Sequence, residues 1–315
     1  ARKLDRRHRI VAVILWCATV VLLAIALAVG NKPLAAGALP MLAGDSFLAA
    51  QSAPAGTIHV DACDPGPGEY NTLTGARTAA SPGDTIVIHG GSYPETLDID
   101  KALTLTASDG PALVGEYYVG SKPVSVTVTV CPDCWEDLPF DANAIVYYPS
   151  DSPGGTQIAC GGPFPVVVYA HGRRDSNWPR CEGWSDPGHP SQDYKRAEGI
   201  LTRLAASGMI AISVDHFGET VFHGKGGIVV NTIAYLRDEH QASGSWLEGA
   251  VRLDRVGLSG HSTGGAAAIY AAGMFDSTDY EPLHLSPVVQ IQGLGLIAPA
   301  CPSWGVPHCL QYSIP

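Results

Sequence analysis

The chain has 315 residues, of which 46% are hydrophobic and 16% are charged, and its 36 glycines and 24 prolines predict many turns. This length and composition suit a folded chain of one or two domains and exclude a disordered or fibrous protein. The formal net charge is −11, and no cluster of basic residues follows residue 9, which argues against a nucleic-acid-binding protein.

An apolar stretch close to the N-terminus predicts how the chain meets a membrane. Residues 1–9 are strongly basic, whereas residues 10–30 carry no charge and contain Thr19 as their clearly polar side chain. About twenty helical residues span the hydrocarbon core of a bilayer. We expect residues 10–30 to be a transmembrane anchor, with the basic tail in the cytoplasm and the following chain exported. A cleaved signal peptide, which would give a secreted protein, and a buried core helix are the alternatives.

The cysteines agree with an exported protein. The chain has eight, and the number outside the apolar stretch is odd, so at least one thiol lacks a partner within the chain. We expect Cys131 and Cys134 to form a structural disulfide rather than a zinc or redox site, because no second pair of ligands lies nearby. Sequence alone does not determine the other pairings; proximity favours Cys160–Cys181 and Cys301–Cys309.

Residues 31–55 are rich in Ala, Gly, Ser and Pro, and we predict that they form a linker. Residues 56–115 contain short β-branched runs between glycines and prolines, which predict a small β-rich segment with one short helix. The strands are predicted over 57–60, 84–89, 95–99 and 103–106, and the helix over 72–80.

The stretch from Ser81 to Glu95 resembles the opening coil of right-handed parallel β-helix proteins of the pectin-lyase-like group. In those proteins many coils stack, and each buries its face on the next. Residues 56–115 hold at most one or two coils. We therefore carry over no carbohydrate-binding groove from the resemblance.

Residues 116–315 alternate between strand and helix patterns, which predicts an α/β domain with a mostly parallel sheet covered by helices on both faces. The run at 165–170 is continuously apolar, as expected of a strand buried on both faces. The other predicted strands are 124–130, 144–148, 209–214, 256–259 and 288–292, and the predicted helices are 192–206, 228–239 and 263–273.

The pattern Gly260-His261-Ser262-Thr263-Gly264 matches G-x-S-x-G and lies between a predicted strand and a predicted helix. This is the strand–turn–helix setting of a nucleophile elbow, which exposes the serine hydroxyl at a sharp turn. The two glycines let the strand and the helix approach closely. We therefore predict that Ser262 is a nucleophile; the alternative is an ordinary glycine-rich turn.

A second motif, His171-Gly172, directly follows the strand predicted over 165–170. In nucleophile-elbow enzymes this loop donates one backbone N–H to the oxyanion hole, and the residue after the nucleophile donates the other. The matching donors are the N–H groups of Arg173 and Thr263. We expect His171 to be structural rather than the general base, and a plain strand-ending turn is the alternative.

Three motifs together resemble the α/β-hydrolase superfamily: Pro163–Gly172, Ala211–Asp215 and Gly260–Gly265. Within it, the similarity over residues 116–315 is to exported lipases, cutinase-like polyesterases and platelet-activating-factor acetylhydrolase-like serine esterases. The resemblance implies hydrolysis of carboxylic esters of lipid, acyl or polyester type through an acyl-enzyme on Ser262, without a cofactor or metal.

The family's chain order is serine, then acid, then histidine, and the later part of the chain does not supply this set. No Asp or Glu follows Glu281, and His284 and His308 are expected to be surface or structural residues. Asp215 ends the fourth strand and is expected to be structural or to line the substrate pocket. We therefore expect the triad acid and histidine beyond residue 315, and very low activity without them.

Two further interpretations remain open. One is a catalytically inactive, membrane-tethered scaffold or binding module built on a degenerate hydrolase fold, and the other is an acyltransferase that uses the same acyl-enzyme. His216 and His223 are predicted to be loop residues near the rim of the site. Three aromatic side chains are candidates either for lining an acyl cleft or for local packing: Trp178, Trp184 and Tyr194.

Overall fold

The computed structural model describes residues 55–132, 134, 137–172, 193–216, 222–275 and 277–299. The predicted basic tail, the predicted anchor and all but the last residue of the predicted linker lie outside these ranges. None of the helices in the described ranges combines the length and the hydrophobicity needed to cross a bilayer.

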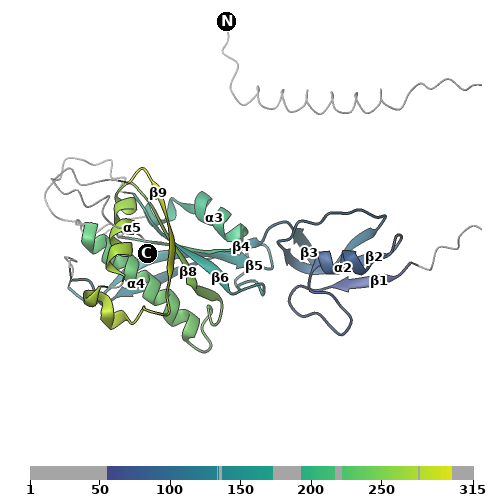
Figure 1. The fold of residues 1–315 in the computed structure, drawn as a ribbon, viewed down its shortest axis with the longest axis horizontal. Helices are drawn as coiled ribbons and strands as arrows, with labels where there is room; N and C mark the ends of the chain where they lie inside the picture. Colours follow the sequence, from purple (N-terminus) through teal and green to yellow (C-terminus); the bar gives the residue numbers. More distant parts are fainter. Residues whose placement is uncertain are drawn as a thin grey trace, which may run out of the picture. The chain divides into compact units, whose positions relative to one another are not determined.

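The first part of the described chain is a three-stranded parallel sheet with one helix (Figure 1). The strands lie side by side in the order β1-β2-β3. Thr72 caps the helix, because its side chain accepts a hydrogen bond from the Gly75 N–H. The elements are β1 (Thr57–Val60), α2 (Leu73–Ala79), β2 (Thr85–Tyr93) and β3 (Thr104–Val114). Their buried core consists of Val60, Leu73, Ala76, Ala80, Ile86, Ile88 and Tyr93.

One predicted strand in this part is wrong, because residues 95–99 form no strand. The Glu95 carboxylate instead accepts hydrogen bonds from the backbone N–H groups of Leu73 and Thr74, at 2.7 and 3.0 Å. These donors belong to the first turn of α2, which has no partners for them within the helix. The strands β2 and β3 also run further than predicted. One sheet with one helix does not confirm the β-helix resemblance.

The larger part of the chain contains a six-stranded sheet in the order β4-β5-β7-β6-β8-β9. The strands β7, β6, β8 and β9 are parallel to one another, whereas β5 pairs antiparallel with both β4 and β7. The predicted mostly parallel sheet is confirmed. Its strands are β4 (Tyr118–Val128), β5 (Phe140–Ser150), β6 (Phe164–Ala170), β7 (Ile210–Val214), β8 (Val251–His261) and β9 (Ile291–Ile297).

Helices cover both faces of this sheet, as predicted (Figure 1). Alternate residues of β6 show the two faces: Val166 and Val168 pack in the core under α4 and α5, and Tyr169 packs with Leu201 of α3. Burial on both faces explains why β6 reads as an unbroken apolar run. The helices are α3 (Glu198–Ala206), α4 (Phe222–Gln241) and α5 (Thr263–Met274).

Several predicted boundaries are wrong. The strand placed at 288–292 lies at Ile291–Ile297 instead; Val289 is buried outside any strand, which explains its hydrophobic pattern. The strand predicted over 144–148 is longer at both ends, since β5 runs from Phe140 to Ser150. The helix predicted over 192–206 is a short 3₁₀ turn, Asp193–Lys195, followed by α3.

The disulfide between Cys131 and Cys134 is confirmed. The pairing of Cys160 with Cys181 is wrong, because Cys160 forms a disulfide with Cys63, 97 residues earlier in the chain. Proximity in the sequence predicts the wrong partner because the disulfide joins the loop after β5 to the segment that follows β1. The predicted pair Cys301–Cys309 lies outside the described residues.

Candidate active site

Ser262 lies at the turn between the end of β8 and the start of α5, with φ 53° and ψ −119°. A positive φ is rare for a residue with a side chain and costs on the order of 1–3 kcal/mol, so it persists where the surroundings hold it. The backbone of Ser262 is held at both ends: its N–H donates to the Ile297 carbonyl at 3.0 Å, and its carbonyl accepts from the Gly265 N–H at 3.0 Å. This is the sharp turn that the motif predicts.

The two motif glycines allow the close contacts that this turn needs. A Cβ added at Gly260 would lie 2.3 Å from the Gly264 carbonyl oxygen. A Cβ added at Gly264 would lie 2.0 Å from the Ala170 carbonyl oxygen, at the end of β6. Both contacts are with backbone atoms, which cannot move aside as a flexible side chain does. The start of α5 therefore packs directly on the loop after β6.

That loop reaches the candidate nucleophile. A Cβ added at Gly172 would lie 3.2 Å from the Ser262 Cβ, so the chain after His171 passes beside the serine. Arg173, predicted to donate one oxyanion N–H, lies outside the described residues. The other predicted donor, Thr263, is the first residue of α5, so its N–H lies at the positive end of the helix dipole.

A buried polar cluster that the sequence reading did not find lies behind this loop. The His171 Nδ1 donates to the Gly172 carbonyl at 3.1 Å, and its Nε2 lies 3.2 Å from an Asp215 carboxylate oxygen. The His171 and His216 rings stack with their centroids 4.1 Å apart. The Lys225 ammonium, on α4, donates to the His216 carbonyl at 3.2 Å and lies 3.3 Å from its Nδ1.

These contacts give the cluster a structural role. His171 is 3% exposed and both its ring nitrogens face polar partners inside the protein, so neither is directed at an incoming substrate. The Asp215 carboxylate is nearly buried and lies 3.2 Å from the His171 Nε2. His216 is a loop residue, as predicted, but it is buried, because its ring stacks on that of His171 and lies against Lys225 of α4. The cluster connects β6, β7 and α4 behind the candidate nucleophile.

A cavity of about 470 Å³ adjoins the elbow. The loop after β6 and the last residue of β8 form one side, through His171, Gly172 and His261, and the start of α3 forms the other. The Ile200 side chain gives the cavity an apolar patch, and the ion pair between Arg196 and Asp193, at 2.7 Å, gives it a polar one. A small organic group bound here would lie beside the elbow.

No family model and no curated protein matches the chain. Among solved structures, a bacterial heroin esterase is 17% identical over 57% of this chain, with a TM-score of 0.36, and an inhibited esterase B from Lactobacillus rhamnosis is 19% identical over 57%, with a TM-score of 0.35. The chain spans about half the length of these two esterases, 44% and 49%. Similarity at this level does not assign a function to the chain.

Other residues singled out from the sequence lie away from Ser262 or outside the described ranges. His284 follows α5 and precedes β9, which places it at the opposite edge of the parallel sheet from the serine. His223 lies in α4, not in a loop, and its ring meets that of Tyr270 edge-on at 4.3 Å. Tyr194 is 5% exposed and does not line the cavity, which corrects one candidate for the cleft. Outside the described residues lie Trp178, Trp184 and His308.

The buried cluster makes stability depend on pH. Burial, followed by the charges of His171 and Lys225, lowers the pKa of His216 well below 6.5. The unfolded chain takes up a proton at this histidine below about pH 6.5 and the folded chain does not, so the free energy of unfolding decreases as the pH falls from there. The expected slope from this group is about 1.4 kcal/mol per pH unit.

Urea unfolding of the wild type and of His216→Asn at pH 7.5, 6.5 and 5.5 measures this slope. Asparagine provides an oxygen that can accept from Lys225 in place of the imidazole Nδ1, and it does not titrate. We expect the variant to lose less stability than the wild type between pH 6.5 and 5.5. Equal slopes in the two proteins would show that His216 is not the group responsible.

Proposed function

We propose that this protein is an exported serine hydrolase of carboxylic esters with Ser262 as the nucleophile. The observation that carries the proposal is the conformation of Ser262, a non-glycine residue at φ 53° between a strand and a helix, with the β6 loop against its Cβ. Such strain at a turn is a feature of functional sites. The ester class of substrate rests on the resemblance of the motifs.

In the proposed reaction the Ser262 hydroxyl attacks the ester carbonyl carbon and forms a tetrahedral intermediate. The negative charge on the former carbonyl oxygen is stabilised by the backbone N–H groups of Thr263 and Arg173, and the N-terminus of α5 adds to this stabilisation. The alcohol leaves, an acyl-serine remains, and water hydrolyses it. The cavity beside the elbow is the proposed place for part of the substrate.

The proton of the serine hydroxyl requires a general base. His171 is unsuited to that role, because its Nδ1 bonds to the Gly172 carbonyl and its Nε2 faces Asp215 and the His216 N–H. We propose that the base and its carboxylate are a histidine and an acid beyond residue 315, in the family's chain order. The His171 cluster then serves to hold the oxyanion loop.

Export is part of the proposal and rests on two features of the chain. The basic tail followed by an apolar stretch has the order of an anchor or signal segment. The disulfides Cys63–Cys160 and Cys131–Cys134 suit an oxidising compartment. The proposed location is therefore outside the cytoplasm, either anchored through residues 10–30 or secreted.

Labelling with a fluorophosphonate tests the proposal, because this reagent phosphonylates a serine only where a base activates it. The protein at its natural length, isolated from its own source, is treated, digested and analysed by mass spectrometry. We expect the added mass on Ser262. An unlabelled protein, or a label on another serine, would contradict the proposal, and the first of these results would favour the inactive, membrane-tethered scaffold.

A further inference from the structure

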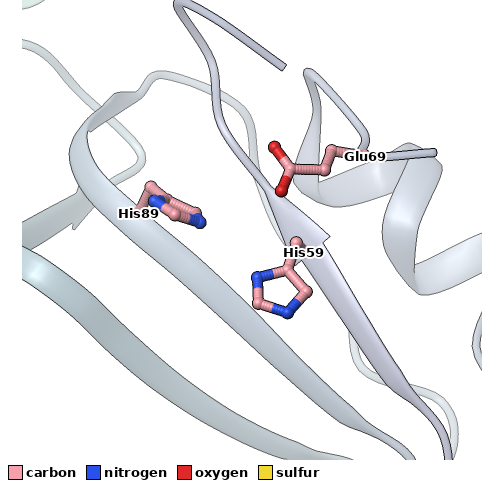
Figure 2. A group of neighbouring side chains, drawn as sticks. All are labelled: His59, Glu69 and His89. Atoms are coloured by element: carbon pink, nitrogen blue, oxygen red, sulfur yellow. The ribbon is translucent and has the colours of Figure 1, made fainter. Parts of the chain in front are cut away.

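Three side chains that the sequence reading passed over converge in the β-rich part of the chain (Figure 2). His59 lies on β1, His89 lies on β2, and Glu69 lies in the connection that leads to α2. In the parallel pairing of β1 with β2, His59 lies opposite Val87, so His89 is two residues further along and on the same face of the sheet. One nitrogen of each ring and a carboxylate oxygen all lie within 4.8 Å of one another.

One nitrogen of each imidazole is available to act as a ligand. The His59 Nδ1 and the His89 Nε2 are both buried, and neither has a hydrogen-bond partner among the described residues. A buried polar atom without a partner is costly, which calls for an explanation at each such position. Two such nitrogens directed at one point are explained together by a group that binds both.

A second carboxylate orients one of the two rings. The His89 Nδ1 lies 2.7 Å from an Asp109 carboxylate oxygen, on β3. A proton on Nδ1 satisfies this contact, and it leaves the lone pair of Nε2 free to point at His59 and Glu69. A carboxylate bound to the far nitrogen of a histidine is the usual support of a metal-binding imidazole.

The carboxylate of Glu69 is also held in place. Its Oε2 accepts a hydrogen bond from the Gly66 N–H at 2.8 Å, within the same connection. Backbone bonds join this connection to β1, because the Tyr70 N–H donates to the His59 carbonyl at 3.0 Å. The three side chains therefore come from segments that are already bonded to one another.

We propose that His59 Nδ1, His89 Nε2 and the Glu69 carboxylate bind one divalent transition-metal ion of the zinc type. Two imidazoles and one carboxylate suit such an ion, whereas Ca²⁺ and Mg²⁺ prefer oxygen ligands throughout. In a tetrahedral zinc site the ligand atoms lie about 3.3 Å apart, so small side-chain movements close the arrangement seen here. Water completes the fourth position.

The ion would connect β1, β2 and the chain between β1 and α2. The buried core of this part is small, with seven side chains that include two alanines. Small cores commonly need a disulfide or a metal for stability. The site is independent of Ser262, so its presence or absence leaves the proposed hydrolase function untouched.

Zinc titration by calorimetry tests the proposal. The 315-residue chain is treated with a chelator and dialysed under non-reducing conditions, which keep the Cys63–Cys160 disulfide intact, and free thiols are alkylated so that they bind no zinc. We expect one zinc per chain at this site, retained in an excess of Mg²⁺ and Ca²⁺. Co²⁺ in place of zinc is expected to give the visible absorption of a four-coordinate site.

The zinc affinities of variants at the proposed ligands test whether the ion binds at this cluster. His59→Ala and His89→Ala are each expected to weaken zinc binding by about 100-fold or more, and Asp109→Asn, which removes only the support of His89, by about 10- to 100-fold. Glu69→Gln keeps an acceptor for the Gly66 N–H and loses the charge that the ion needs. His284→Asn, an exposed histidine distant in sequence, is the matched control and is expected to bind zinc as the wild type does.

Two outcomes would overturn the proposal. One is the absence of stoichiometric zinc binding by the wild type. The other is unchanged binding and an unchanged cobalt spectrum in all the cluster variants. Because the alanine variants could fail to fold, circular dichroism accompanies each, and Asp109→Asn and Glu69→Gln, which nearly preserve shape, decide the result in that case.

Discussion

Ser262→Ala is expected to reduce the rate of ester hydrolysis by roughly 10⁵- to 10⁶-fold, as the loss of an acyl-forming serine does in other serine hydrolases. The change removes the atom that forms the covalent bond and leaves the turn between β8 and α5 in place. The rate is measured on p-nitrophenyl butyrate with the protein at its natural length. Binding and the oxyanion donors remain, so a small residual rate above water is expected.

The matched control for this change is Ser259→Ala, three residues earlier on β8. The Ser259 hydroxyl donates to the Gly295 carbonyl of β9 at 2.6 Å and takes no part in the proposed reaction. We expect that variant to keep its activity within a few-fold of the wild type. If both variants stay active, the nucleophile lies elsewhere in the chain; if both are inactive, damage to the sheet explains the loss.

Gly264→Ala is expected to lower the free energy of unfolding by more than about 3 kcal/mol, at or beyond the usual cost of overpacking. The new methyl group would lie 2.0 Å from the Ala170 carbonyl oxygen and 2.5 Å from that of His171. Relief requires α5 to move away from the end of β6. The midpoint of urea unfolding measures the loss of stability. Movement of α5 also shifts the oxyanion loop, so we expect activity to fall as well.

Gly199→Ala is the control for the helix propensity of the substitution. Gly199 lies in α3, and a Cβ there would meet no atom within 4 Å. Alanine in an open helical position stabilises by about 0.5–1 kcal/mol. A Gly264→Ala protein as stable as Gly199→Ala would mean that α5 does not pack on the β6 loop in the way described.

The turn at Ser262 is a structural feature that a local sequence motif predicts correctly. The motif Gly260–Gly264 predicts a sharp turn between a strand and a helix, because its two glycines allow the strand and the helix to approach closely. The structure has this turn, with Ser262 at positive φ. The apolar run of β6 likewise predicts a strand buried on both faces, and helices cover both. Chemical roles at the elbow stay predictions.

Other features depend on contacts between segments that are distant in the chain. The position of β9 was misjudged because Val289 is buried without being in a strand, while the glycine-containing Ile291–Ile297 pairs along β8. Cys160 forms its disulfide with Cys63, and the spacing of the cysteines in the sequence does not predict this pairing. The strand predicted at 95–99 does not form, and Glu95 instead accepts hydrogen bonds from the first turn of α2.

The alternation of strands and helices and the place of the sharp turn follow from the amino-acid sequence, because each depends on residues that are close together in the chain. Which polar groups come into contact depends instead on how distant segments pack together. His171 follows β6, Asp215 follows β7 and Lys225 lies on α4. His59 and His89 come from two strands. The interactions of these buried nitrogens and charges depend on partners that folding brings within about 3–5 Å. No local sequence pattern encodes those distances.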